Sequence, residues 1–232
     1  MRKMLLSLFL LLASLVGSLA LEDLDGKAFV FPVATNTARV VLKPTIPRPL
    51  TNFTLCMRVY TELTRGYTLF SYASKRDSNE ILLYLEKPYQ FSFHVGGPGV
   101  TFNVPQKFSN SPFGEHVCAS WESATGLVEL WMNGQPLVRK SLRKGLSVSA
   151  EASIILGQEQ DSYGGGFDIN QCLVGEITDV YMWERILSPG EVVFAWHNYP
   201  RPDYLINWKS LSYDIVGDVF VKPALLSAQR AG

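Results

Sequence analysis

The stretch HVCASWESATGLVELWMNG, residues 116–134, holds two runs of β-type residues and a turn signal that follows the second run. The runs are rich in valine, leucine and tryptophan and are separated by Gly126, which is typical of two strands joined by a short connection. Asn133-Gly134 is the dipeptide that most strongly favours a tight hairpin turn. We therefore predict antiparallel strands at His116–Ser120 and Leu127–Met132.

The same strand signals recur along most of the chain, several of them with alternating apolar and polar residues. Many short, evenly spaced strands favour a sandwich or a jelly roll. One segment differs: Ser188-Pro189-Gly190-Glu191 is a helix capping box, and the apolar run after it stops at Tyr199-Pro200. We expect an all-β, antiparallel jelly-roll sandwich of the lectin type with one short helix. The further predicted strands are Ala28–Pro32, Arg39–Leu42, Phe53–Tyr60, Tyr67–Tyr72, Ile81–Leu85, Gln90–Val95, Ser153–Leu156 and Ile177–Trp183.

Composition excludes two classes of protein. The chain has 232 residues, of which 47% are hydrophobic and 18% charged, so it carries too much apolar content for a disordered protein. Its 21 basic and 21 acidic side chains balance, whereas a nucleic-acid-binding protein would need a basic surface. No nucleic-acid-binding motif is found.

The first 20 residues, MRKMLLSLFLLLASLVGSLA, have the pattern of a secretory signal peptide. Arg2 and Lys3 form the basic start, an apolar run follows, and Ser18 and Ala20 suit cleavage after residue 20. The alternative is a membrane anchor, for which the apolar run is only marginally long enough. We expect a leader over 1–20, one mature domain over 21–232, secretion to the extracellular space, and no transmembrane anchor.

Secretion bears on the three cysteines and on one glycosylation sequon. An oxidising compartment favours one disulfide and one remaining thiol. Cys56 and Cys118 both lie in apolar, strand-like stretches, so we pair them and leave Cys172 free, although spacing does not exclude the other pairings. Asn52-Phe53-Thr54 is an N-glycosylation sequon. Asn52 is expected to carry a glycan, the alternative being an unmodified surface turn.

Carboxylates and amides gather in residues 157–171, GQEQDSYGGGFDINQ. Ca²⁺ binds six to eight oxygens from such groups, and Glu159 and Asp161 point the same way if the segment is extended. Asp168 and Gln171 can complete the shell after the glycines. The alternative is a solvated acidic loop. The order of residues is not that of an EF-hand, and the three histidines of the chain lack the spacing of a zinc site.

The hypothesis that the protein is an enzyme has less support. Jelly-roll glycanases carry a Glu-x-Asp-x-x-Glu run, and Glu159-x-Asp161 matches its first half, but Gly164 stands where the second glutamate belongs. No nucleophile elbow, phosphate loop or dinucleotide fingerprint is present. We therefore expect a protein that is not an enzyme, and keep a glycan-acting enzyme and a structural calcium-binding carrier as alternatives.

The segment His116–Ser123 matches the pentraxin signature His-x-Cys-x-[Ser/Thr]-Trp-x-[Ser/Thr] in full. The block Leu156–Phe167 and the start Lys27–Pro32 are also similar to those of the short pentraxin family, and the resemblance covers essentially the whole mature chain. It implies a flattened jelly roll with one helix on one face, the Cys56–Cys118 disulfide, and a cyclic homo-oligomer, usually a pentamer. It also implies a lectin-like role in innate immunity and the acute-phase response.

The resemblance further implies two calcium ions per subunit, which bind phosphorylated or anionic groups on microbes or damaged cells. One position departs from the family, because Ser78 stands where an aspartate precedes Asn79. The first site is therefore expected to be weakened, with Asp77 as an alternative ligand if the loop shifts. The matching positions are Asn79, Glu159, the Gln160 main-chain carbonyl and Asp161 for the first ion, and Glu159, Asp161, Asp168 and Gln171 for the second.

The resemblance places a ligand pocket at Leu82, Tyr84 and His94. Choline-binding members of the family have a threonine at the position of His94 and a glutamate at that of Gly99. A quaternary ammonium favours an aromatic face and a nearby anion, so phosphocholine binding is expected to be poor. Phosphoethanolamine or a sugar acid is the expected ligand, and ordinary sheet packing is the alternative role for Tyr84 and His94.

The opposite face also departs from the family. Trp196 replaces a tyrosine, and Asn133 an aspartate, that members of the family use to engage complement. We therefore do not expect complement or Fc-receptor binding.

Overall fold

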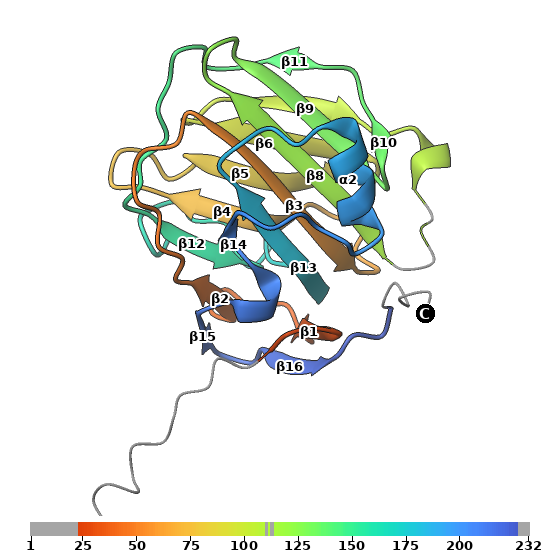
Figure 1. The fold of residues 1–232 in the computed structure, drawn as a ribbon. Coiled ribbons are helices and arrows are strands. Elements are labelled where there is room, and N and C mark those ends of the chain that lie inside the picture. The colour runs from red at the N-terminus through yellow and green to blue at the C-terminus, as the bar shows by residue number, and fades with distance from the viewer. Residues whose placement is uncertain (1–22, 110, 112–113, 227–232) are drawn as a thin grey trace, which may run out of the picture.

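The computed structural model describes residues 23–109, 111 and 114–226, so the predicted leader over 1–20 lies outside the described residues. Two antiparallel β-sheets are stacked as two layers (Figure 1). Helix α2 (Pro189–Trp196) lies on the outer face of one sheet. The predicted all-β sandwich with one short helix is confirmed.

Both sheets place strands side by side that are far apart in the sequence. The first consists of β10 (Gln135–Pro136), β9 (Leu127–Met132), β8 (Glu115–Glu122), β3 (Asn52–Tyr60), β13 (Gly175–Trp183), β1 (Lys27–Phe31) and β16 (Phe220–Pro223), with β11 (Lys140–Ser141) beside β9 and β14 (Tyr204–Ile206) beside β13. The second consists of β15 (Tyr213–Val216), β2 (Arg39–Leu42), β12 (Ser153–Leu156), β4 (Tyr67–Ala73), β5 (Ile81–Lys87), β6 (Gln90–Val95) and β7 (Gly99–Asn103). The single-turn helices are η1 (Gln106–Phe108) and η2 (Trp208–Ser210).

Aromatic side chains join the two layers. The ring of Phe53 on β3 lies 6.0 Å from that of Phe93 on β6 and 6.0 Å from that of Trp121 on β8. All three side chains are fully buried. Phe53 and Trp121 lie on paired strands of one sheet, and Phe93 lies on the other sheet. Burying an aromatic side chain removes a large apolar surface from water, so the Phe53–Phe93 contact holds the two sheets together.

All ten predicted strands are found, each within two residues of its predicted bounds. The sequence did not predict β7, β10, β11, β14, β15 and β16. These strands are short, and β7, β15 and β16 are largely exposed sheet edges that lack the apolar runs of the core strands.

Local chemistry explains helix α2. The Ser188 hydroxyl accepts from the Glu191 backbone N–H, and the Glu191 carboxylate accepts from the Ser188 N–H at 2.8 Å. This is the predicted capping box, which satisfies two N–H groups that the first turn leaves unpaired. The buried Arg58 on β3 donates to the Trp196 carbonyl and pairs with Asp179, so it anchors the end of the helix on the sheet.

Candidate calcium-binding face

The connection between β12 and β13, residues 157–174, covers part of the outer face of β4. The Thr68 N–H donates to the Gln171 carbonyl at 2.9 Å, and the Gln160 N–H donates to the Ser71 hydroxyl at 3.2 Å. Every residue of β4 is buried, although β4 belongs to a two-layer sandwich with one face outward. The predicted calcium residues of this connection are thereby held against the sheet that does not carry α2.

Gln160 fastens the connection to the sheet with its side chain. Its Nε2 donates to the Ser71 and Ser153 carbonyls at 3.1 and 3.0 Å, and its Oε1 accepts from the Gly164 N–H at 2.9 Å. The side chain is fully buried and its amide is occupied on both ends. A cation would therefore use the main-chain carbonyl of this residue, which is the role predicted for it.

Glu159 is the buried acid of the group, with 6% of its surface exposed. Burial raises the pKa of this carboxyl, and the negative charges of Asp161, Glu86 and Asp168 raise it further. A hydrogen bond from the Asn79 side-chain amide acts in the opposite sense. The structure thus gathers several predicted ligands from the β4–β5 turn and the 157–174 connection around one carboxylate whose ionised form needs a compensating cation.

Two amide oxygens of the predicted set are buried without a hydrogen-bond partner: Asn79 Oδ1 and Gln171 Oε1. Buried polar oxygens are nearly always hydrogen-bonded, and each one left unpaired destabilises the fold. Amide carbonyl oxygens are ligands that Ca²⁺ accepts together with carboxylates. The donor set therefore fits a calcium ion on an observation that is independent of the sequence motif.

The remaining predicted ligands are more exposed. Asp168 is exposed, and its Oδ1 accepts from the Asn170 N–H at 2.9 Å, while the Gln171 N–H donates to the Asp168 carbonyl at 3.0 Å. Asp161 is also exposed and packs closely on Gly166, where an added Cβ would lie 2.8 Å from the Asp161 Cβ. Close chain approach at this glycine fixes the turn that brings the two acids back toward Glu159.

The β4–β5 turn shows how the two residues before Asn79 are placed. Asp77 Oδ1 accepts from the Asn79 N–H at 2.8 Å, which is an Asx-turn. An added Cβ at Gly97 would lie 2.6 Å from Asp77 Oδ2, so this carboxylate faces the β6–β7 turn. Ser78, half-buried, contributes no carboxylate. The Asp77 side chain therefore stabilises the turn through this hydrogen bond.

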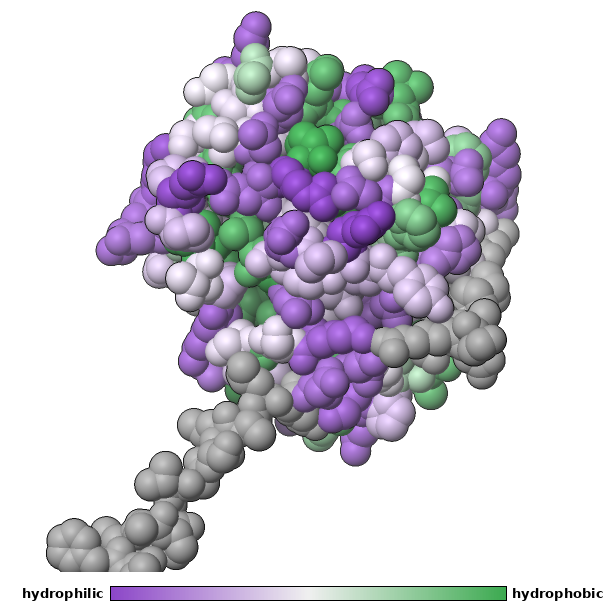
Figure 2. Space-filling model, in the orientation of Figure 1, coloured by the Kyte–Doolittle hydropathy of each residue, from purple (hydrophilic) through white to green (hydrophobic). Residues whose placement is uncertain are grey.

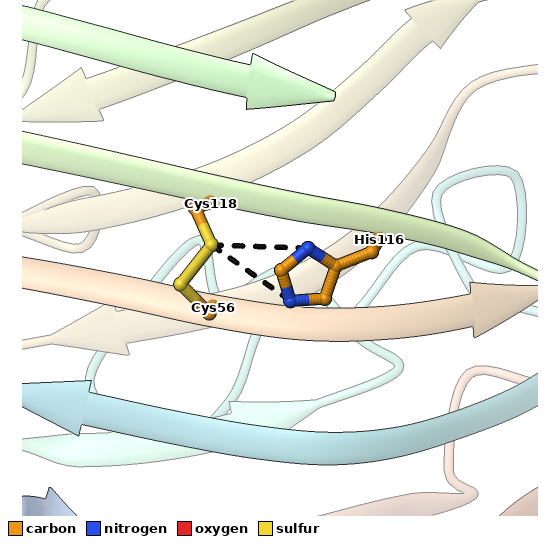
Figure 3. A group of neighbouring side chains, drawn as sticks. All are labelled: Cys56, His116 and Cys118. Atoms are coloured by element: carbon orange, nitrogen blue, oxygen red, sulfur yellow. Dashed lines mark hydrogen bonds between the residues drawn. A yellow bond between two sulfur atoms is a disulfide. The ribbon is translucent and has the colours of Figure 1, made fainter. Parts of the chain in front are cut away.

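A second group of metal-ligand residue types lies inside the sandwich. Among the described residues, Cys56, His116 and Cys118 are the one set of three such side chains whose ligand atoms all lie within 4.8 Å of one another (Figure 3). The two sulfurs are joined to each other at 2.01 Å, which confirms the predicted disulfide and removes both thiolates. Burial holds the pKa of His116 well below its usual value, so this ring is neutral. The carboxylates of the candidate calcium face are spread more widely than this set.

The predicted pocket residues share the outer face of β5 and β6. Leu82 pairs with His94 across the two strands, and Tyr84 lies two residues from Leu82 on the same face. The Tyr84 hydroxyl lies over Gly66, where an added Cβ would come within 2.2 Å of it. Burial and the negative charges of Glu86, Glu159 and Asp168 raise the pKa of Tyr84. The pocket therefore adjoins the carboxylate group.

The sequence analysis did not identify Arg65, which precedes β4 and holds the 157–174 connection through hydrogen bonds. Its Nη1 donates to the carbonyls of Gly66, Asn170 and Cys172 at 2.7, 3.1 and 2.7 Å. Its Nη2 lies 3.5 Å from the buried Cys172 thiol, which itself donates to the Ile169 carbonyl at 3.1 Å. One sequence signal was available. Thr68 and Ser71 are polar residues in the otherwise apolar strand β4, which indicates that another polar segment packs on this strand.

Replacing Arg65 with alanine is expected to weaken calcium binding by about 10- to 100-fold, because groups that orient metal ligands contribute on that scale. Arg65→Lys keeps one donor and is expected to lose less. Calcium titration calorimetry measures the effect, and thermal unfolding in chelator separates it from global destabilisation. Arg48→Ala is the matched control, since Arg48 is an exposed arginine paired with Glu184. Unchanged calcium affinity in Arg65→Ala would contradict the assignment.

Comparison with known proteins places these observations in context. A model of the Pentaxin family matches residues 27–223. The chain is 50% identical over 219 residues to C-reactive protein of Homo sapiens, which covers 94% of this chain and 96% of that protein. It is 47% identical to serum amyloid P-component of Homo sapiens, over 91% of this chain and 94% of that protein, and 46% identical to mucosal pentraxin of Bos taurus, over 97% and 100%.

A solved structure confirms the fold. The native heptameric SAP-like pentraxin from Limulus polyphemus superposes with a TM-score of 0.76, covering 90% of this chain and 99% of that one. Sequence identity between the two is 23%, so this similarity shows the fold alone.

Proposed function

This chain belongs to the Pentaxin family, and we propose that it recognises phosphorylated or anionic groups through bound calcium. The observation that carries the proposal is the pair of partnerless buried oxygens, Asn79 Oδ1 and Gln171 Oε1; the Asn79 side chain also hydrogen-bonds the buried carboxylate of Glu159. A bound cation would give these atoms the partners that the protein alone does not supply. The proposed ligands are Asn79, Glu159, the Gln160 carbonyl and Asp161 for one ion, and Glu159, Asp161, Asp168 and Gln171 for the other.

Bound calcium would supply open coordination positions that accept oxygens of a phosphate or another anion. Leu82, Tyr84 and His94 would contact the rest of the ligand, for which phosphoethanolamine, phosphocholine and sugar acids are the candidates. The relatives that match this chain are recognition proteins, so it is not an enzyme and the glycan-acting alternative is set aside.

The proposal includes secretion, a glycan on Asn52 and a role in innate immunity and the acute phase. A leader pattern over 1–20 and a formed Cys56–Cys118 disulfide support secretion. Among the described residues, none of the helices has the length and apolar character that crossing a bilayer requires. Asn52 begins β3 and is half-buried.

We place the chain in a cyclic homo-oligomer, with a pentamer as the expected ring. The SAP-like pentraxin from Limulus polyphemus, which has this fold, is heptameric, so a ring of seven is the alternative. A ring that presents all calcium faces on one side would convert several weak sites into avid binding to a repetitive surface.

Complement and Fc-receptor binding is not part of the proposal. Asn133 is buried, and both ends of its side-chain amide are hydrogen-bonded. Its Oδ1 accepts from the His116 N–H at 2.8 Å and its Nδ2 donates to the Phe108 carbonyl at 2.7 Å. Trp196 lies across the adjacent turn, where a Cβ at Gly134 would come within 2.7 Å of its ring. Figure 2, which views the α2 side, shows apolar patches scattered among hydrophilic residues.

Titration of calcium into the metal-free mature protein, repeated with phosphoethanolamine and with phosphocholine, tests the proposal. We expect binding of at least one phosphorylated ligand in calcium and its loss in chelator. Calcium binding without either ligand would favour the structural calcium carrier. Absence of calcium binding would overturn the proposal.

Replacing Ser78 with aspartate is expected to tighten the weaker calcium step by about tenfold, because added ligand charge raises the affinity of an oxygen site. Ser78→Asn, which adds a neutral oxygen of the same reach, is the matched control. Calorimetric titration resolves the two steps. Two equal, tight steps in the unmodified protein would show that Ser78 does not weaken the site.

A further inference from the structure

Residues of both sheets line a cavity of about 410 Å³ at the end of the sandwich where β3 ends and β8 begins (Figure 1). Its apolar wall includes Leu85 and Phe91, which face each other in the β5–β6 register. Cavities of this size, with mainly apolar walls and a few polar groups, are the usual sites of small organic ligands. Among the described residues that line this end cavity, none belongs to the predicted calcium or ligand residues.

Glu115 supplies a carboxylate to the end cavity. It begins β8 opposite Val59 and is half-buried. The Ser109 hydroxyl donates to its Oε1 at 3.0 Å, and the Asn133 side-chain amide donates to its Oε2, so the carboxylate is held in place. A carboxylate has about four acceptor positions, which leaves room for a hydrogen bond from a ligand.

Tyr67 supplies the second polar group. Its side chain lines the end cavity and is 5% exposed, and no described residue forms a hydrogen bond with its hydroxyl. Burial, together with the negative charge of Glu115, raises the pKa of Tyr67, so the phenol is neutral and within electrostatic reach of that carboxylate. Buried polar groups nearly always have a hydrogen-bond partner, and a ligand in the cavity would supply one.

The charge of the lining indicates the sign of the ligand. Glu62 and Glu115 are acidic, and the described lining residues include neither lysine nor arginine. Tyr60 and Tyr89 line the cavity and are 38% and 40% exposed, so they lie at its open side. Aromatic faces attract cations as well as apolar groups. The lining therefore disfavours an anion and suits a cation that carries an apolar group.

We propose that the end cavity binds an amine on an apolar body, such as an alkylammonium ion, whose ammonium group donates to Glu115 and to the Tyr67 hydroxyl. The alkyl group packs against Leu85 and Phe91. This site is separate from the candidate calcium face, so its occupation does not depend on calcium. A hydrogen bond between charged partners corresponds to a preference on the order of tenfold or more over a neutral ligand of the same shape.

Three ligands of equal chain length test the charge preference. Hexylamine, hexanol and hexanoate are titrated calorimetrically into the full mature protein, once in chelator and once in calcium. We expect hexylamine to bind about tenfold more tightly than hexanol, hexanoate to bind more weakly than both, and calcium to change none of the affinities. Hexylamine that binds no more tightly than hexanoate overturns the proposal. Amine binding that calcium abolishes would place the amine on the acidic residues of the candidate calcium face and overturns it as well.

Two variants assign the binding to the end cavity. Glu115→Gln keeps the shape of the side chain and is expected to lower the affinity for hexylamine to that for hexanol. Tyr67→Phe removes the hydroxyl and is expected to weaken hexylamine binding severalfold. Glu122→Gln is the matched control, because Glu122 is the half-buried glutamate at the other end of β8 and does not line the cavity. Thermal unfolding shows that each variant is folded. Undiminished hexylamine binding in either folded cavity variant contradicts the proposal, whatever the outcome of the calcium titrations.

Discussion

Replacing Glu159 with glutamine is expected to abolish calcium-dependent ligand binding. The residue is the buried acid of the face and, like the exposed Asp161, is proposed to serve both ions. Glutamine has the same shape and keeps an oxygen acceptor for the Asn79 amide, so the substitution removes charge with little change in packing. Losing one partner of a buried charged contact costs about 3 kcal/mol or more, equivalent to roughly a 100-fold loss of calcium affinity.

The metal-free protein is expected to respond in the opposite direction. Burial, followed by Asp161 and other carboxylates, raises the pKa of Glu159 in the fold. A carboxyl whose pKa is raised by folding stabilises the fold only while it is protonated, so at neutral pH its ionised form destabilises the calcium-free protein. Glu159→Gln should therefore unfold at a higher temperature than the unmodified chain in chelator, and should gain no stability from added calcium.

Glu86→Gln is the matched control, because Glu86 also raises the pKa of Glu159 but is exposed and outside the proposed ligand set. It is expected to retain calcium binding. Calorimetry and thermal unfolding with and without calcium provide the two readouts. Calcium-dependent binding that survives in Glu159→Gln would place the ions elsewhere.

The architecture was predictable where the signal is local. The capping box of Ser188 and Glu191 involves residues three apart, so the sequence contains the whole interaction that starts α2. Core strands such as β5 and β6 were predictable because their sequences are rich in apolar and aromatic residues, most of which are buried. The edge strand β16 was missed because it pairs with β1, which is far away in the sequence, so no local pattern indicates the pairing.

For the candidate calcium face, the sequence predicted a set of residues but not their arrangement. Family resemblance identified Glu159 and Asn79, but the unpaired state of Asn79 Oδ1 depends on how the β4–β5 turn folds. The hydrogen bond from Arg65 to the Cys172 carbonyl likewise depends on tertiary placement. No spacing rule in the sequence relates Arg65 to Cys172, which lies 107 residues away.

Removing the disulfide by Cys56→Ala/Cys118→Ala is expected to lower the free energy of unfolding by about 4 kcal/mol. The two cysteines face each other in the β3–β8 register and close a loop with a sequence separation of 62 residues. A cross-link of that length restricts the unfolded chain by about this amount in the chain-entropy model. Domains of this kind are stable by only about 5–15 kcal/mol, so the loss is a large share of the total.

Urea unfolding of the metal-free protein under non-reducing conditions measures the effect, and the unmodified chain in reductant should converge on the variant. Cys172→Ser is the matched control, because Cys172 is also buried but is not cross-linked, and serine keeps a donor for the Ile169 carbonyl. Its effect should stay near 1 kcal/mol, the usual size for a single substitution. A double variant within 1 kcal/mol of the unmodified chain would contradict the expectation, because the cross-link would then add little restriction to the unfolded chain.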